Sequence, residues 1–381
     1  GEPTATPGTG TLSVRRVADA PVGRNGHLAI TLADGSALVM GGSASHTVEV
    51  TDSSTSHRFD MARERFTAGP PLALSAYHHA YTNVVPLRAG AFLLVGGGLN
   101  SGVPPLAPSD ALTQRFDPVR ARFARSGDLQ RERSGDFAAT LLADGRVLVT
   151  GGGIPAVALS EIYDPATDRW QISGNLLIAR RGHTATLLPD GRVLVAGGFF
   201  CCTDNTEFFS DAAEIFDPAT GSFALTGTLQ QTRAFHRATL LADGRVLLSG
   251  GYVAPPPQAT ARTAATASAE IFDPATGKFS TTNSMQVARV DHSALLLRDG
   301  RVLVVAGFRA EDGDGIAQTE LFDASTGTWS AGPLVPPPSE DVLGPPPSAG
   351  STATLLGNGK VLVFGGRDTF GFPRATAYLL E

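Results

Sequence analysis

The sequence has only two cysteines, which are neighbours in the chain, and it has no long hydrophobic run. Two adjacent cysteines cannot cross-link distant segments, so a fold held together by disulfides is excluded. No apolar stretch approaches the ~20 residues of a membrane-spanning helix. No Ser/His/Asp order, phosphate-binding loop or zinc motif is recognisable. These absences leave the internal repetition of the chain as its main signal.

Positive charge is also scarce, and nearly all of it is arginine. The chain has 30 Lys and Arg against 36 Asp and Glu, a net charge of -6, and only Lys278 and Lys360 are lysine. This balance gives no general attraction for nucleic acid or for an anionic membrane surface. The arginine bias is typical of GC-rich bacterial genomes. The Pro/Thr/Gly-rich start without Met favours a secreted, periplasmic or cell-surface protein. We expect a monomer.

One sequence motif recurs seven times along the chain. Its clearest copy runs from Arg181-Gly182-His183 through the turn Asp190-Gly191 to the doublet Gly197-Gly198. Doublets of small residues begin at positions 41, 96, 151, 197, 250, 306 and 365, so that successive copies are 46 to 59 residues apart. A period of this length indicates one four-stranded unit for each blade of a propeller.

Each copy has the pattern of four short strands. An apolar strand leads to an Asx-Gly pair, which suits a two-residue hairpin because both turn positions accept φ > 0. The second strand, Arg-Val-Leu-Val, is apolar on both faces and ends at the doublet. The third strand ends in Tyr/Phe-Asp, and the fourth carries an aromatic residue, as Asp217 and Phe223 illustrate.

The last copy has no fourth strand, and the N-terminal segment supplies one. Thr9-Gly10-Thr11-Leu12 matches the fourth-strand pattern in register, so we expect residues near Leu12 to pair with the strand around Tyr378. Such pairing closes the ring and removes exposed sheet edges. We expect one domain over 1–381, with a flexible lead at 1–10. Its blades are expected around 24–66, 77–123, 133–170, 180–223, 233–279, 289–329 and 350–381 plus 11–19.

The doublet, the Tyr/Phe-Asp-Pro sequence and the spaced aromatic residue resemble the kelch repeat over essentially the whole chain. The resemblance implies an all-β, seven-bladed kelch β-propeller of bacterial type, distantly similar to the propeller domain of the galactose oxidase family. It implies much less about function, because kelch propellers serve as adaptors, sugar-processing enzymes and copper oxidases.

Variation in length singles out one face of the predicted ring. The turns of one face are short and nearly identical, whereas the long segments all belong to the other face: 99–111, 199–211, 252–267, 309–317 and 335–348. Loops on a rigid scaffold usually carry function. We therefore expect the site at the loop-rich face, around the central funnel.

An arginine precedes the first strand in five copies: Arg24, Arg133, Arg180, Arg233 and Arg289. The resemblance to kelch adaptor domains implies a cationic mouth that binds carboxylate or sulfate groups. A glutamate recurs in four of the same copies: Glu161, Glu214, Glu270 and Glu320. A repeated ion pair within each blade would explain both columns, and the sequence leaves both interpretations open.

A histidine column, His27, His183, His236 and His292, stands seven residues before the turn in four copies. Its regular placement indicates scaffold hydrogen bonds, because a functional site is rarely copied around a ring.

The position just before that column differs between copies. It is glycine in two copies, whereas we assign His79, Asp136 and Asp291 to it in three others. The two aspartates could act as acid/base groups or as ligands of a hard metal. The resemblance to the galactose oxidase family implies a copper-binding histidine near His78-His79. That family's Cys–Tyr cofactor pair is not found, so the catalytic residues stay unknown and these three are candidates.

Cys201-Cys202, flanked by Phe199-Phe200 and by Phe208-Phe209, can close a vicinal disulfide. This strained, rigid ring would form an apolar platform for a ligand, and the phenylalanines would extend it. A disulfide that only stiffens the loop and a soft-metal site are the alternatives.

The sequence leaves the cofactor unknown, with copper and calcium as the candidates. The acidic segment 311–315 could hold Ca²⁺, although a solvated turn explains it more simply.

The resulting prediction is an exported propeller that binds an anionic or polar glycan, peptide or small molecule at the funnel face, with the Cys201-Cys202 loop over the site. The alternative is an enzyme that uses the same funnel, either a copper-dependent oxidase or a sugar-acting lyase or epimerase. Whether the protein is an enzyme stays open.

Overall fold

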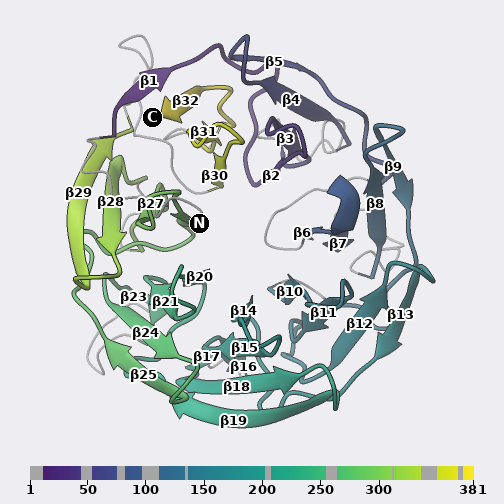
Figure 1. Ribbon diagram of the computed structural model, residues 1–381, viewed down its shortest axis with the longest axis vertical. Helices are drawn as coiled ribbons and strands as arrows, with labels where there is room; N and C mark the ends of the chain where they lie inside the picture. Colours follow the sequence, from purple (N-terminus) through teal and green to yellow (C-terminus); the bar gives the residue numbers. More distant parts are fainter. Residues whose placement is uncertain are drawn as a thin grey trace, which may run out of the picture.

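The computed structural model describes residues 12–43, 54–74, 82–96, 111–133, 136–201, 207–254, 264–310, 313, 315–335, 350–367 and 372–381. Within these ranges, seven four-stranded antiparallel sheets surround a central axis, as Figure 1 shows. The protein is a seven-bladed β-propeller, which confirms the fold predicted from the repeats. Among the described residues, no helix is long and apolar enough to cross a membrane.

Each blade runs from an inner strand at the axis to an outer strand at the rim (Figure 1). The first three blades are β2 (Leu28–Thr31), β3 (Ala37–Met40), β4 (Ser56–Asp60) and β5 (Arg65–Ala68); β6 (Thr82–Pro86), β7 (Phe92–Gly96), β8 (Thr113–Asp117) and β9 (Arg122–Arg125); β10 (Ala138–Leu141), β11 (Val147–Thr150), β12 (Ser160–Asp164) and β13 (Arg169–Ile172).

Blades four to six follow the same order. They are β14 (Thr184–Leu187), β15 (Val193–Ala196), β18 (Ala212–Asp217) and β19 (Ser222–Thr228); β20 (Arg237–Leu240), β21 (Val246–Ser249), β24 (Ala269–Asp273) and β25 (Lys278–Thr281); β26 (Ser293–Leu296), β27 (Val302–Val305), β28 (Gln318–Asp323) and β29 (Thr328–Leu334). Two small hairpins, β16 (Phe199–Cys201) with β17 (Glu207–Phe209) and β22 (Tyr252–Val253) with β23 (Ala264–Ala265), are added to blades four and five.

The seventh blade combines both ends of the chain. It consists of β30 (Ser351–Leu355), β31 (Val361–Gly365), β32 (Ala377–Leu380) and, as its outer strand, β1 (Val14–Arg16). Val14 lies opposite Leu380 and Arg16 lies opposite Tyr378. The predicted closure by the N-terminal strand is therefore confirmed. Its predicted register was wrong by two residues, because Val14 and not Leu12 takes the position that Phe223 has in blade four.

The core lies between the blades and is formed mainly by the second strands. Every residue of β3, β11, β15, β21 and β27 is buried, as the Arg-Val-Leu-Val pattern predicts. Leu194 of β15 and Leu248 of β21 belong to one apolar cluster, so this core joins neighbouring blades. The third- and fourth-strand aromatic residues pair within a blade, for example Phe216 with Phe223 at 4.8 Å between ring centroids.

The doublet glycines lie where one blade touches the next. A Cβ atom on Gly151 would lie 2.3 Å from the carbonyl oxygen of Arg180 and 2.6 Å from His183 Cε1, both in the following blade. Ala306 replaces the first glycine before blade seven, where Ser351 stands in place of the histidine, opposite Gly365. The doublet therefore leaves room for the next blade's histidine column.

Candidate functional site

The arginine column forms buried ion pairs within the blades. Arg180 donates from Nη2 to Glu214 Oε1 at 2.8 Å and from Nη1 to the carbonyl oxygens of Gly197 and Ala212, both at 2.8 Å. Both charged side chains have 0% exposure. Burial lowers the pKa of Arg180, and Glu214 opposes this shift. Three further pairs repeat the arrangement: Arg133–Glu161, Arg233–Glu270 and Arg289–Glu320.

These contacts correct the interpretation of the arginines as a cationic mouth. All five guanidinium groups are buried, including that of Arg24, which lies 3.1 Å from His57 Nδ1 where other blades have the glutamate. A ligand at the mouth would not reach them without unfolding the blade edge. The alternative interpretation, an ion pair within the blade, is correct for four of these five arginines.

The histidine column links four of the blades to the blade before each of them, as predicted for scaffold residues. His183 Nε2 lies 2.8 Å from Thr150 Oγ1, and His236 Nε2 lies 3.0 Å from Thr184 Oγ1. His27 and His292 make the corresponding contacts with Thr352 and Ser249. Burial, reinforced by Arg180 and Arg133, lowers the pKa of His183 to about 3. Burial also lowers the pKa of His236 and His292 well below the ordinary value.

These lowered pKa values predict that stability falls on mild acidification. A histidine with a folded-state pKa below its unfolded value is neutral in the fold, so the unfolded state takes up more protons. Stability is therefore full above pH ~6.5 and declines as the pH falls toward the folded pKa, about 3 for His183, by up to about 1.4 kcal/mol per pH unit for each buried histidine.

Urea unfolding between pH 7.5 and 4.5 measures this decline. His183→Gln, which keeps a polar group near Thr150, is expected to give a shallower pH dependence than the wild type. An equally steep dependence in that variant would assign the acid sensitivity to other groups.

The position just before the histidine column forms a collar around the central axis. Its residues have positive φ in six blades: Gly26 (62°), Asp136 (56°), Gly182 (63°), Phe235 (53°), Asp291 (52°) and Gly350 (80°). The backbone N–H of Gly182 donates to the Asp136 carbonyl at 2.7 Å, and that of Phe235 donates to the Gly182 carbonyl at 2.8 Å. Glycine adopts this backbone without strain and aspartate tolerates it.

His79 does not belong to this collar by register, which corrects its assignment. Thr82 lies opposite Gly96, the first doublet residue, and therefore takes the place of the histidine column in blade two. The residue before it is Tyr81, whereas His79 stands three residues ahead of Thr82, where other blades have the arginine. Tyr81, His78 and His79 lie outside the described residues.

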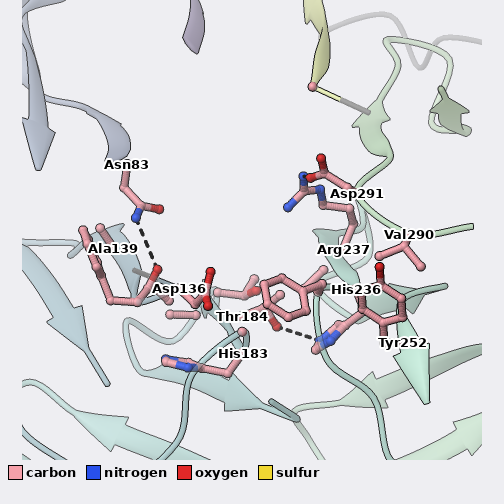
Figure 2. A pocket seen from close by; sticks show the side chains of 18 of the residues that line it. Asn83, Asp136, Ala139, His183, Thr184, His236, Arg237, Tyr252, Val290 and Asp291 are labelled. Atoms are coloured by element: carbon pink, nitrogen blue, oxygen red, sulfur yellow. Dashed lines mark hydrogen bonds and ion pairs between the residues drawn. The ribbon is translucent and has the colours of Figure 1, made fainter. Parts of the chain in front are cut away.

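The collar opens into a central cavity of about 500 Å³, to which both candidate aspartates contribute. Figure 2 shows Asn83 and Asp136 across the cavity from Arg237 and Asp291. The cavity wall also includes Asn25, Phe235, Tyr252, Phe308 and Arg367. The structure thus places Asp136 and Asp291, two of the three candidates from the sequence, in the wall of the same cavity.

Each aspartate is held by an arginine that sequence analysis did not single out. Asp136 Oδ2 lies 2.7 Å from Arg181 Nη2, with 7% of the aspartate side chain exposed, and Asp291 Oδ1 lies 3.0 Å from Arg237 Nη2, with 22% exposed. Arg237 also donates from Nε to the His292 carbonyl at 2.5 Å. The carboxylates are therefore fixed in place beside positive charge at the cavity wall.

An aromatic arc occupies the wall on the side of blades five and six. Phe235 lies 5.6 Å from Phe199 and 6.0 Å from Tyr252, which in turn lies 6.3 Å from Phe308, all between ring centroids. Phe199, Tyr252 and Phe308 each follow the doublet of their blade directly. Aligning that column across the copies would have revealed Tyr252 and Phe308 from the sequence, whereas Phe235 belongs to the column directly before the histidines.

The phenylalanines near Cys201 lie on two faces of the β16–β17 hairpin, not on one platform. Phe199 pairs with Phe209, and Phe200 pairs with Phe208. Successive residues of a strand point to opposite faces, so the two pairs are separated. Phe199 is buried beneath Arg181, whose guanidinium carbon lies 4.9 Å from the ring centroid. Cys202 and the side chain of Cys201 lie outside the described part, so the vicinal disulfide stays a prediction.

The described residues contain no group of three or more His, Cys, Asp or Glu that could hold a metal ion. The histidines near the cavity already contact the neighbouring blade. Of the acidic segment proposed for calcium, Glu311, Asp312 and Asp314 lie outside the described residues.

Comparison with known proteins shows that the fold of this chain is similar to that of a solved structure. No family model matches the chain, and no curated protein matches it. Among solved structures, the chain is similar to a fungal alcohol oxidase of the AA5 family in complex with copper, with a TM-score of 0.74 and 16% identity. The match covers 98% of this chain and 76% of the oxidase. The similarity to the galactose oxidase type of propeller predicted from the repeats is thus confirmed at the level of fold.

Proposed function

We propose that the central funnel binds a small, hydroxyl-rich ligand, such as a saccharide, through the pairs Asp136–Arg181 and Asp291–Arg237. The observation that carries the proposal is the convergence of two fixed carboxylates, from different blades, on one cavity. Carboxylate oxygens accept hydrogen bonds from ligand hydroxyls, and guanidinium groups donate to them. A cavity of about 500 Å³ has the size of a small-molecule site.

The cavity wall combines the carboxylates of Asp136 and Asp291 with Arg237 and Arg367, and these mixed charges suit a polar ligand. The buried arginine column does not face the ligand, and Arg181 and Arg237 each have an aspartate partner. Asn25 and Asn83 add amide groups on the side opposite the aromatic arc. The proposal therefore keeps the polar alternative of the sequence-based prediction, with a glycan or small molecule as the ligand.

Asp291→Asn is expected to weaken ligand binding tenfold or more. The change keeps a residue that tolerates positive φ but removes the charge, and a hydrogen bond to a charged group contributes roughly 1.5–3 kcal/mol. Thermal shifts with methyl hexopyranosides and hexitols at millimolar concentration would identify a ligand, and calorimetry would give its Kd.

Asp190→Asn is the matched control, because Asp190 lies at an exposed Asp-Gly turn and pairs with Arg192 outside the funnel. Its Kd should equal that of the wild type. Equal binding by Asp291→Asn and the wild type would refute the proposed site.

The likeness to the alcohol oxidase favours a second function, copper-dependent oxidation of an alcohol in the same funnel. The described residues do not supply a copper-binding set, so this function depends on residues outside them, with His79 as the candidate from the sequence. One tightly bound copper per chain, lost in His79→Ala together with oxygen consumption in the presence of a primary alcohol, would favour the oxidase.

A further inference from the structure

We infer that the funnel recognises an amphipathic ligand, a polyol carrying an aryl group, and that Phe235 determines this preference. The inference rests on the proposed function and adds the chemistry of the ligand's second half. The aryl ring would lie against Phe235, Tyr252 and Phe308, and the hydroxyl-bearing part would face Asn25, Asn83 and the two aspartate–arginine pairs.

The accessible aromatic rings of the cavity wall are gathered in blades five and six, which fits such a ligand. Blades one to three contribute Asn25, Asn83 and Asp136. Blades five and six contribute the half-buried rings of Phe235, Tyr252 and Phe308, together with the Arg237–Asp291 pair. The one aromatic residue of the polar side is Phe137, whose ring is 5% exposed and belongs to the core. A ligand that is polar throughout would leave the three rings in contact with hydroxyl groups.

The arc has the geometry of a curved apolar wall. The Phe235 and Tyr252 rings are edge-to-face with an interplanar angle of 89°, and the Tyr252 and Phe308 rings meet at 68°. Edge-to-face neighbours fix one another's orientation and leave ring faces and edges available to a third ring. An aryl group would therefore find both stacking and edge contacts here.

Phe235 occupies a backbone conformation that its side chain disfavours. Its φ of 53° is left-handed, and the same collar position is glycine in three other blades. A bulky residue in this region is an outlier, and such strain persists mainly where function requires the side chain. Phe235 is the only non-glycine, non-aspartate residue among the six described collar positions.

A structural role is the competing explanation for Phe235. A Cβ atom on Gly182 would lie 3.2 Å from Phe235 Cε2, so the ring also covers the neighbouring collar residue. If packing alone explains Phe235, then its replacement by glycine should destabilise the protein and leave ligand preference unchanged. If ligand contact explains it, the same change relieves backbone strain and removes the preference.

Calorimetry with matched methyl and phenyl hexopyranosides of gluco, galacto and manno configuration tests the inference. For the configuration that binds, the wild type is expected to bind the phenyl glycoside at least tenfold more tightly than the methyl glycoside. Phe235→Gly should reduce this ratio to about one without lowering the melting temperature. Tyr252→Leu, which alters a residue without positive φ, should reduce the ratio in part.

Each contrary result has a distinct meaning. Equal binding of methyl and phenyl glycosides by the wild type would overturn the amphipathic ligand and leave the proposed function standing. No binding of either would contradict the proposed function as well. A large drop in melting temperature for Phe235→Gly, with the phenyl preference retained, would assign Phe235 to packing over Gly182.

Discussion

Arg180→Met is expected to destabilise the protein by about 3–5 kcal/mol, because it leaves the Glu214 carboxylate buried without its ion-pair partner. Both side chains have 0% exposure, and Arg180 also satisfies the carbonyl groups of Gly197 and Ala212. The loss is therefore one of charge neutralisation and of hydrogen bonding inside the blade. Equilibrium unfolding in urea at pH 7.5 would measure it.

Two comparisons make this prediction specific to the buried pair. Arg192→Met removes an exposed partner of Asp190 in the same blade and should change the unfolding free energy by less than about 1 kcal/mol. Adding Glu214→Gln to Arg180→Met should restore part of the loss, since glutamine keeps the acceptor for the Leu177 N–H but carries no charge. A single variant as stable as Arg192→Met would contradict the role given to the pair.

Blade two already carries the neutral version of this arrangement. Gln114 accepts hydrogen bonds from the N–H groups of Ala73 and Leu74, as Glu214 does from Leu177 and Ile178. The arginine position in that copy is His79. Glutamate thus occurs where an arginine is present to neutralise it, which explains why the two columns recur together.

The sequence predicted the fold because the repeat determines strands, turns and core together. The Asp190-Gly191 pair lies in the predicted turn, with Arg192 N–H donating to Asp190. However, the turn has three residues between the paired Leu188 and Arg192, not two, and of the Asp-Gly pair only Gly191 has positive φ, at 86°. The β15 run Val193–Ala196 is buried as its composition requires. These features depend on local backbone preference and on apolar pattern, both of which can be read from one copy and checked against six others.

The site was only partly predictable, because it lies where the copies differ. Asp136 and Asp291 could be found as departures from glycine. Arg181 and Arg237 are also exceptions in their columns, but the sequence does not show which aspartate each arginine contacts. The sequence also could not decide whether Arg180 faces Glu214 or a ligand, since that depends on the direction of the side chain. His79 was misplaced because Thr82 does not resemble the histidine whose place it takes.

Deletion of residues 1–19 is expected to leave the ring barely stable or unfolded. The segment pairs β1 with β32, and further backbone hydrogen bonds join Ser13 to Glu381 and Val17 to Ala377. Val17 is also buried in the core between blades one and seven. At about 1 kcal/mol per hydrogen bond and 1.5–3 kcal/mol for a buried valine, the loss is on the order of 5 kcal/mol or more. That is comparable to the whole stability of many proteins.

Arg15→Ala is the control that removes the surface ion pairs of β1 and keeps the strand itself. Arg15 contacts Glu64 of blade one and Glu381 at the chain end, and these groups are partly exposed. Because exposed pairs contribute little, this variant should unfold within about 1 kcal/mol of the wild type. The deletion should also expose the edge of β32, whose free hydrogen-bonding groups favour association between molecules. Melting temperature and light scattering measure both effects, and a truncated chain that is monomeric with wild-type stability would contradict closure by β1 as a stabilising feature.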